Sequence, residues 1–173
     1  MNRRVRVGRT AVVLGCALAL GAALTGCAKG HTTSAAASSS SSGAGLPTYD
    51  VSVQKFTYSG MPDSFKSGKL LLTFSNHETF PITHEMVLVG LPAGKSKQDV
   101  IDDAKKKGDK SEDDWLHFGE VPDVNTGATK AQVFSLPPGT YAIACWQTGT
   151  PQGKPEGGPV HLTIGMIHQF TVT

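Results

Sequence analysis

From residue 47 to the C-terminus, apolar and polar residues are arranged in short runs that predict β-strands. Val51 and Val53 alternate with polar neighbours, and residues 69–76 are nearly all apolar. Clusters of Gly, Pro and Ser separate the runs, as turns require. Six or more short strands with such turns predict an all-β, antiparallel sandwich. The predicted strands are residues 49–57, 69–76, 84–91, 131–136, 140–147 and 166–172.

One stretch between these runs has the pattern of a short helix. Ser96 and Asp99 have the spacing of a capping box, with the shorter acid in place of Glu. Three lysines at 105–107 precede Gly108, where we expect the helix to end. Residues 115–118, Trp-Leu-His-Phe, follow a polar run. We interpret them as an anchor of the helical insert on the sandwich, and a partner-binding patch is the alternative.

The start of the chain predicts export. Four arginines within residues 3–9 precede an apolar segment, residues 10–23, that is too short and too rich in Gly and Ala for a committed membrane span. Residues 24–27, Leu-Thr-Gly-Cys, resemble the bacterial lipoprotein cleavage box. The resemblance implies a signal peptide over residues 1–26 and a lipid on the thiol of Cys27. An ordinary signal peptide with an incidental cysteine is the alternative.

The next segment predicts a tether. Residues 27–46 are mostly Ser, Ala, Thr and Gly, which cannot bury enough apolar surface to order themselves. Residues 47–173 then remain for one folded domain, and about 127 residues suffice for a single core. We therefore expect an extracytoplasmic domain that is anchored by lipid to the cell membrane.

Removal of the signal peptide changes the charge of the protein. The whole chain has a formal net charge of +2. All four arginines lie in the signal peptide, so the mature chain keeps 12 lysines against 14 acidic residues, a net charge of −2. This balance, and the absence of arginine, predict no nucleic-acid partner. We expect a monomer.

The cysteines point to a metal. Cys16 leaves with the signal peptide and Cys27 is lipidated, so Cys145 has no partner in the chain. A free thiol in an exported protein needs burial, a ligand or a partner chain. His84, Cys145, His161 and Met166 together are the set that a type 1 (blue) copper site uses, with two imidazoles and a thiolate in a plane and a weak axial thioether. Taken singly, each of the four is also an ordinary core or surface residue.

Three segments resemble the cupredoxin family, the plastocyanin-like blue-copper proteins. Residues 72–76 lead through Pro81 to His84, as the family's strand, Asn and Pro lead to its first ligand. Residues 138–141, Pro-Gly-Thr-Tyr, precede Cys145, and His161 and Met166 precede a last strand at 170–172. The resemblance implies a Greek-key β-sandwich and one copper ion per chain, with His84, Cys145 and His161 equatorial and Met166 axial.

The chain departs from the family pattern in two places. The residue before the first ligand is Thr83 instead of Pro, and residues 146–160 separate Cys145 from His161, where well-known members have only a few residues. This lengthening costs about 1–2 kcal/mol of closure entropy. Structural metal sites release on the order of 10 kcal/mol, so the loop alone does not abolish binding. His77, next to Asn76, is the one substitute for His84.

The resulting hypothesis is a membrane-tethered, copper-binding electron-transfer protein with transient redox partners. Copper storage or delivery, with copper-exchange partners, is the first alternative. A metal-free binding module of the same fold is the second. We do not expect an enzyme, because Cys145 has no recognisable orienting group or oxyanion hole beside it. The domain also has too few histidines for the additional copper ions of an oxidase.

Overall fold

The computed structural model describes residues 45–150 and 157–173. The predicted signal peptide, Cys27 and nearly all of the predicted tether lie outside these residues. No helix in the described part of the chain is long and apolar enough to cross a membrane. The strands are β1 (Thr48–Gln54), β2 (Thr57–Ser59), β3 (Ser64–Phe65), β4 (Gly68–Asn76), β5 (Thr83–Leu91), β6 (Leu116–Asn125), β7 (Thr129–Leu136), β8 (Gly139–Ala144) and β9 (Ile167–Val172). The helices are α1 (Lys97–Lys107) and two 3-10 helices, η1 (Gly108–Asp114) and η2 (His161–Ile164).

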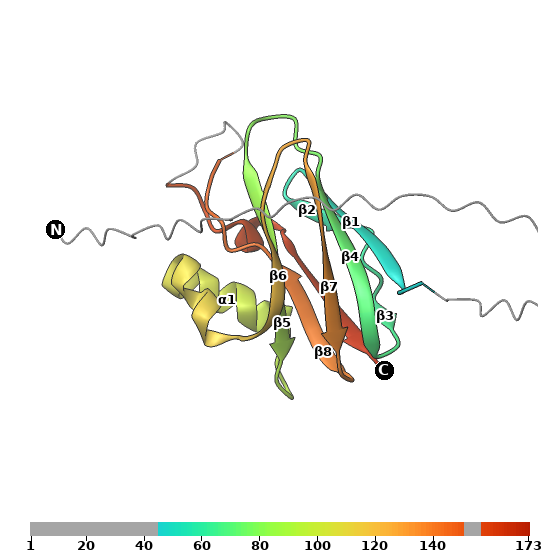
Figure 1. The fold of residues 1–173 in the computed structure, drawn as a ribbon. Coiled ribbons are helices and arrows are strands. Elements are labelled where there is room, and N and C mark those ends of the chain that lie inside the picture. Colours follow the sequence, from blue (N-terminus) through green and yellow to red (C-terminus); the bar gives the residue numbers. More distant parts are fainter. Residues whose placement is uncertain (1–44, 151–156) are drawn as a thin grey trace, which may run out of the picture. The chain divides into compact units, whose positions relative to one another are not determined.

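The strands form two sheets, which confirms the predicted β-sandwich with one short helical insert (Figure 1). The order is β2-β1-β4-β7 in one sheet and β3-β9-β8-β5-β6 in the other. The prediction of purely antiparallel strands is wrong, because β1 pairs in parallel with β4 and β3 with β9. Between β1 and β4 the chain crosses to the second sheet, where it forms β3. Because of this crossover connection, β4 returns beside β1 and runs in the same direction.

The strands β5 and β8 are buried on both faces. Their side chains alternate between the core between the sheets and a second core under the helix α1, which lies beside β5 in Figure 1. This double burial explains why residues 86–91 carry no polar side chain and do not alternate. The inner set is Met86, Leu88, Tyr141, Ile143 and Cys145, and the outer set is Val87, Val89, Ala142, Ala144 and Trp146, which pack with Val100 and Ala104 of α1.

The helical insert begins and ends where the sequence predicts. The Ser96 hydroxyl accepts from the Gln98 backbone N–H at 3.2 Å, and the Asp99 carboxylate accepts from the Ser96 backbone N–H at 2.9 Å. This pair is the predicted capping box. Gly108 caps the C-terminus with a φ of 69°, a conformation that favours glycine.

The predicted strand 49–57 is wrong in one respect, because it breaks at Lys55 and Phe56. These residues have φ values of 52° and 56° and turn the chain from β1 into β2. Two central residues with positive φ match the type I′ hairpin turn, which normally carries Asn or Gly. Neither residue occurs here, so the sequence has no turn signal.

The strand β6 is not among the strands that the sequence predicts. Its alternation is disguised by Gly119 and Pro122, and its pairing with β5 contains two register shifts. The anchor predicted at residues 115–118 is confirmed for the two aromatic residues, because Trp115 packs against the core under α1 and Phe118 packs against the core between the sheets. Leu116 is 66% exposed.

Asn76 at the end of β4 joins the segments that lead to His84. Its buried amide nitrogen donates to the backbone oxygens of Ile82 at 3.0 Å and Val124 at 2.9 Å. Its side-chain oxygen accepts from the backbone N–H of Glu78 at 3.1 Å. Because these bonds are internal, water cannot replace them when the amide is removed.

We predict that Asn76→Ala lowers the free energy of unfolding by about 2–3 kcal/mol, because buried partners lose their hydrogen bonds. The matched control is Asn125→Ala, which removes an exposed hydrogen bond of 2.7 Å to Thr83. This control should cost at most about 0.5 kcal/mol. Denaturant unfolding of both variants checks the prediction, and equal losses would contradict it.

Candidate metal centre

Cys145 follows β8 directly and continues its alternation, so its side chain belongs to the core between the sheets. Its backbone N–H donates to the Met166 carbonyl at 3.1 Å, and its carbonyl accepts from the Leu162 N–H at 2.9 Å. Two backbone bonds therefore hold the cysteine against the segment that carries His161 and Met166. Cys145 is the one free, buried cysteine in the described part of the chain.

The long connection between Cys145 and His161 is closed at its base. The His161 N–H donates to the Gln147 carbonyl at 2.9 Å, and Thr148 forms a β-bridge with Val160. Gly149 and Gly158 also approach so closely that a Cβ at Gly158 would lie 2.0 Å from the Gly149 oxygen. The two ends of the connection therefore meet, and its length does not separate Cys145 from His161.

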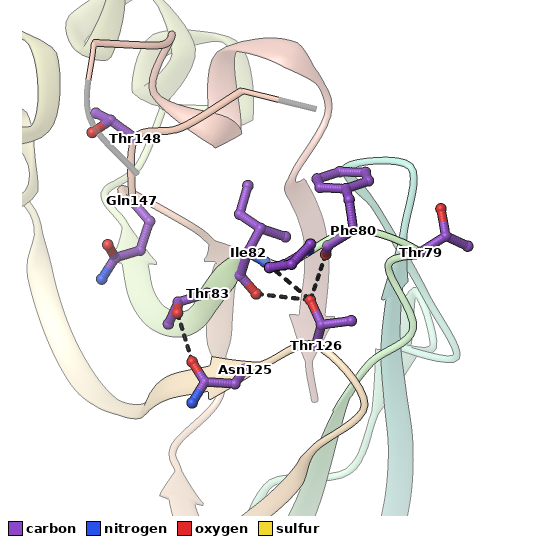
Figure 2. Close-up of a pocket in the computed structure, with 9 residues that line it drawn as sticks. Thr79, Phe80, Ile82, Thr83, Asn125, Thr126, Gln147 and Thr148 are labelled. Atoms are coloured by element: carbon purple, nitrogen blue, oxygen red, sulfur yellow. Dashed lines mark hydrogen bonds between the residues drawn. The ribbon is translucent and has the colours of Figure 1, made fainter. Parts of the chain in front are cut away.

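His84 lies near the start of β5, after a segment that Thr126 fixes (Figure 2). The Thr126 hydroxyl donates to the Phe80 carbonyl at 2.7 Å and accepts from the Ile82 N–H at 3.0 Å. A cavity of about 580 Å³ adjoins this segment and is lined by residues 79–83, Asn125, Thr126, Gln147 and Thr148. No proline directly precedes His84. Hydrogen bonds from Thr126 and Asn76 nevertheless fix the segment that leads to this histidine.

Three of the four predicted ligands meet at one point. The Nδ1 atoms of His84 and His161 are 3.0 Å apart. The Cys145 Sγ lies 3.4 Å from the His161 Nδ1 and 3.9 Å from the His84 Nδ1. All three side chains are fully buried, at 0% exposure. The structure thus brings together residues that are far apart in the sequence.

The triangle of donor atoms has the size that a metal ion needs. The point equidistant from the three atoms lies about 2.0 Å from each, which is close to metal–imidazole and metal–thiolate bond lengths. The Nε2 atoms of both histidines are buried and have no hydrogen-bond partner among the described residues. Two imidazoles and a thiol form the equatorial donor set of a type 1 copper site, so the residues fit this ion.

Met166 is fully buried in the same inner core as Cys145. Its N–H donates to the His161 carbonyl at 3.1 Å, and its carbonyl accepts from Cys145. These two hydrogen bonds hold the backbone of Met166 beside the backbones of His161 and Cys145. The proposed substitute ligand, His77, is exposed and lies outside the cluster, as do His117 and His168.

The surroundings keep the donor atoms neutral at pH 7 in the absence of metal. Burial lowers the pKa of His84 to about 4, and burial with the neighbouring His84 lowers the pKa of His161 to about 3. Burial and then the charge of Glu85 raise the pKa of the Cys145 thiol. Both imidazoles therefore have free lone pairs, whereas a metal must displace the thiol proton.

Glu85 fixes the residues that follow the cysteine. One carboxylate oxygen accepts from the Trp146 backbone N–H at 2.8 Å, and the other accepts from the Gln147 side chain at 3.2 Å. Burial raises the pKa of Glu85 to about 7. The Trp146 indole points to the face of the sheet opposite Cys145, where its N–H donates to the Ser111 hydroxyl at 2.9 Å. The residue that follows Cys145 is therefore anchored to the helical insert.

Two residues of the site, Phe56 and Glu78, are not predicted from the sequence. The Phe56 ring lies edge-on to both imidazoles, with centroid distances of 5.4 Å to His84 and 4.9 Å to His161. The Glu78 carboxylate is buried, 3.6 Å from the His84 Nε2. Both come from turns with no motif, so only their juxtaposition in space connects them to the site.

Comparisons with known proteins agree with the fold. No model of a protein family matches the sequence, and no curated protein matches it. Among solved structures, auracyanin B is 21% identical with a TM-score of 0.51, over 73% of this chain and 88% of that one. Auracyanin from the photosynthetic bacterium Roseiflexus castenholzii is 21% identical (TM-score 0.49), over 73% of this chain and 96% of that one. An azurin from Methylomonas sp. strain J is 17% identical (TM-score 0.46), over 73% of this chain and 96% of that one. The likeness to auracyanin B shows that the chain has the cupredoxin fold.

The lowered pKa values of the two histidines predict an acid-sensitive metal-free protein. Between pH 6.5 and the lowered values, the unfolded chain binds protons that the folded chain does not, so stability falls as the pH falls. Glu85 acts in the opposite direction above pH 4.5, because its raised pKa favours proton uptake by the folded state.

We therefore predict that His161→Gln, which removes one of these groups and keeps Glu85, gains stability relative to the wild type as the pH is lowered from 7 to 4.5. Denaturant unfolding of the metal-free proteins at both pH values measures this difference. A difference that does not change with pH would contradict the assignment of His161 as a buried neutral imidazole.

Proposed function

We propose that this chain is a copper-binding electron-transfer protein with one type 1 site, formed by His84, Cys145, His161 and Met166. The observation that carries the proposal is the convergence of two imidazole nitrogens and one thiol sulfur in a fully buried triangle on the cupredoxin fold. A bound copper ion would supply one-electron exchange between its Cu(II) and Cu(I) states.

The chain's own residues would keep the site the same in both states. Backbone bonds on both sides of Cys145 fix the thiolate, which is the strongest donor and the electronic route out of the site. Asn76 and Thr126 hold the approach to His84, and the pinched base of the loop holds His161. A site that cannot relax needs little reorganisation when the charge changes, which suits an electron carrier without substrate turnover.

The burial of the site argues for retention of the metal. Copper storage or delivery requires ligands that an exchange partner can reach, whereas His84, Cys145 and His161 are all fully buried. We therefore rank electron transfer above copper exchange. A metal-free binding module is the remaining alternative, and a metal titration separates the three.

We further propose that Cys27 is lipidated and tethers the domain to the outer face of the cell membrane. The support is the Leu-Thr-Gly-Cys box at residues 24–27 after a basic and apolar leader, followed by a segment rich in Ser, Ala and Gly. The tether would let a monomeric domain reach transient, membrane-bound redox partners.

We predict that the reduced full-length protein binds one Cu(II) ion and develops an intense blue or green thiolate-to-copper absorption band. Cys145→Ser and His161→Ala should lose the band, because each removes an equatorial donor. His117→Ala, an exposed histidine outside the cluster, is the matched control and should keep it. The visible spectrum during titration is the measurement.

Two other outcomes of this titration would contradict electron transfer. Tight Cu(I) binding without a coloured Cu(II) form would indicate copper handling. Failure to bind either ion stoichiometrically would leave a metal-free module.

We predict that the full-length protein, produced in its bacterial host, fractionates with the membrane and carries a lipid on Cys27. Mass spectrometry of the mature N-terminus and membrane fractionation measure these properties. Cys27→Ser should move the protein to the soluble fraction or leave the signal peptide uncleaved, whereas Cys16→Ser should have neither effect. Recovery of an unmodified Cys27 in a soluble wild-type protein would refute the tether.

A further inference from the structure

Glu78 has a buried carboxylate and is not one of the predicted metal ligands. It lies in the loop between β4 and β5, and its side chain is 1% exposed. A buried carboxylate is costly unless hydrogen bonds or charges compensate for its lost hydration. The groups around Glu78 therefore show what its charge is used for.

The first use of the carboxylate is to close the turn between β1 and β2. One oxygen accepts from the Lys55 backbone N–H at 3.0 Å, and the other accepts from the Phe56 backbone N–H at 2.8 Å. Both residues have positive φ, a conformation that costs free energy for a residue with a side chain. Two charge-assisted hydrogen bonds offset this cost and fix the backbone of Phe56.

The fixed turn places an aromatic ring against the two imidazoles. The Phe56 ring meets the His84 ring at 81° and the His161 ring at 66°, so it packs edge-to-face against both. Phe56 is itself 6% exposed. The carboxylate thus acts on His161 indirectly, through the ring that packs against it.

The second use of the carboxylate concerns His84 directly. The Nδ1 of this imidazole points to the other donors, which leaves Nε2 as the nitrogen that carries the proton when a metal is bound. This Nε2 is buried, and the nearest charged group is the Glu78 oxygen at 3.6 Å. A carboxylate behind a metal-ligating histidine orients the ring and makes it a stronger donor.

We infer that Glu78 is a positioning residue of the copper site, which orients His84 from behind and holds Phe56 against both imidazoles. The inference rests on the proposed copper function. Its consequence is a lower reduction potential, because a negative charge beside a ligand favours Cu(II) over Cu(I). One glutamate thereby links the turn after β1 to the electronic state of the metal.

The test compares Glu78→Gln with Glu120→Gln, which removes a negative charge from the exposed face of β6. In the copper-loaded full-length protein, Glu78→Gln should retain the coloured band. It should also raise the ratio of Cu(I) to Cu(II) affinity at least tenfold, which is 59 mV for one electron. Glu120→Gln should change the ratio less than twofold. A structural defect alone would weaken both oxidation states without this shift.

A second readout requires no metal. In the metal-free protein, Glu78→Gln should increase hydrogen exchange at the Lys55 and Phe56 amides at least tenfold, because an NH2 group replaces one of the two accepting oxygens. Glu120→Gln should leave these amides unchanged. This measurement separates the two proposals, because it reports on the turn even if the wild type does not bind copper.

Wild-type protein provides a readout that does not depend on the folding of a variant. In the diamagnetic Cu(I) form, the His84 Nε2 proton should exchange slowly with water and resonate downfield. The inference is overturned if this proton exchanges as fast as the ring N–H protons of the exposed His117. It is also overturned if Glu78→Gln and Glu120→Gln have equal potentials in protein that binds copper.

Discussion

The donor atoms converge because Cys145 is held by backbone hydrogen bonds to the segment that contains His161 and Met166. The cysteine donates to Met166 and accepts from Leu162, so the last strand and the η2 turn cannot move away from it. The bond between His161 and Gln147 then fixes the histidine at the base of the long loop. Since these bonds are made by the backbone, they do not require particular side chains at these positions.

Burial makes this arrangement chemically useful. The β5 and β8 strands are covered on both faces, so His84 and Cys145 are fully buried. Burial disfavours the protonated imidazole of His84 and the ionised thiolate of Cys145. The cost of burying polar atoms is offset by Asn76 and Glu85, which hydrogen-bond the backbone around the donors. Glu78 and Phe56 complete the enclosure on the side of β1 and β2.

The sequence predicts much of this structure where local patterns carry the information. The capping box at Ser96, the strand after Gly68 and the order of His84, Cys145 and His161 are all local or ordered signals. The turn at Lys55 carries no glycine, β6 is disguised by bulges, and the two parallel pairs depend on a crossover. Glu78 could not be assigned from the sequence, because its partners lie on a separate hairpin and only tertiary packing brings them together.

The central claim is that Cys145 binds copper together with two imidazoles. X-ray absorption at the copper edge of the Cu(II)-loaded protein tests it most directly, because the fine structure distinguishes sulfur from nitrogen among the nearest neighbours. The account predicts one short copper–sulfur bond and two imidazole nitrogens, with loss of the sulfur in Cys145→Ser. A first shell made only of nitrogen and oxygen would show that copper binds elsewhere and would contradict the account.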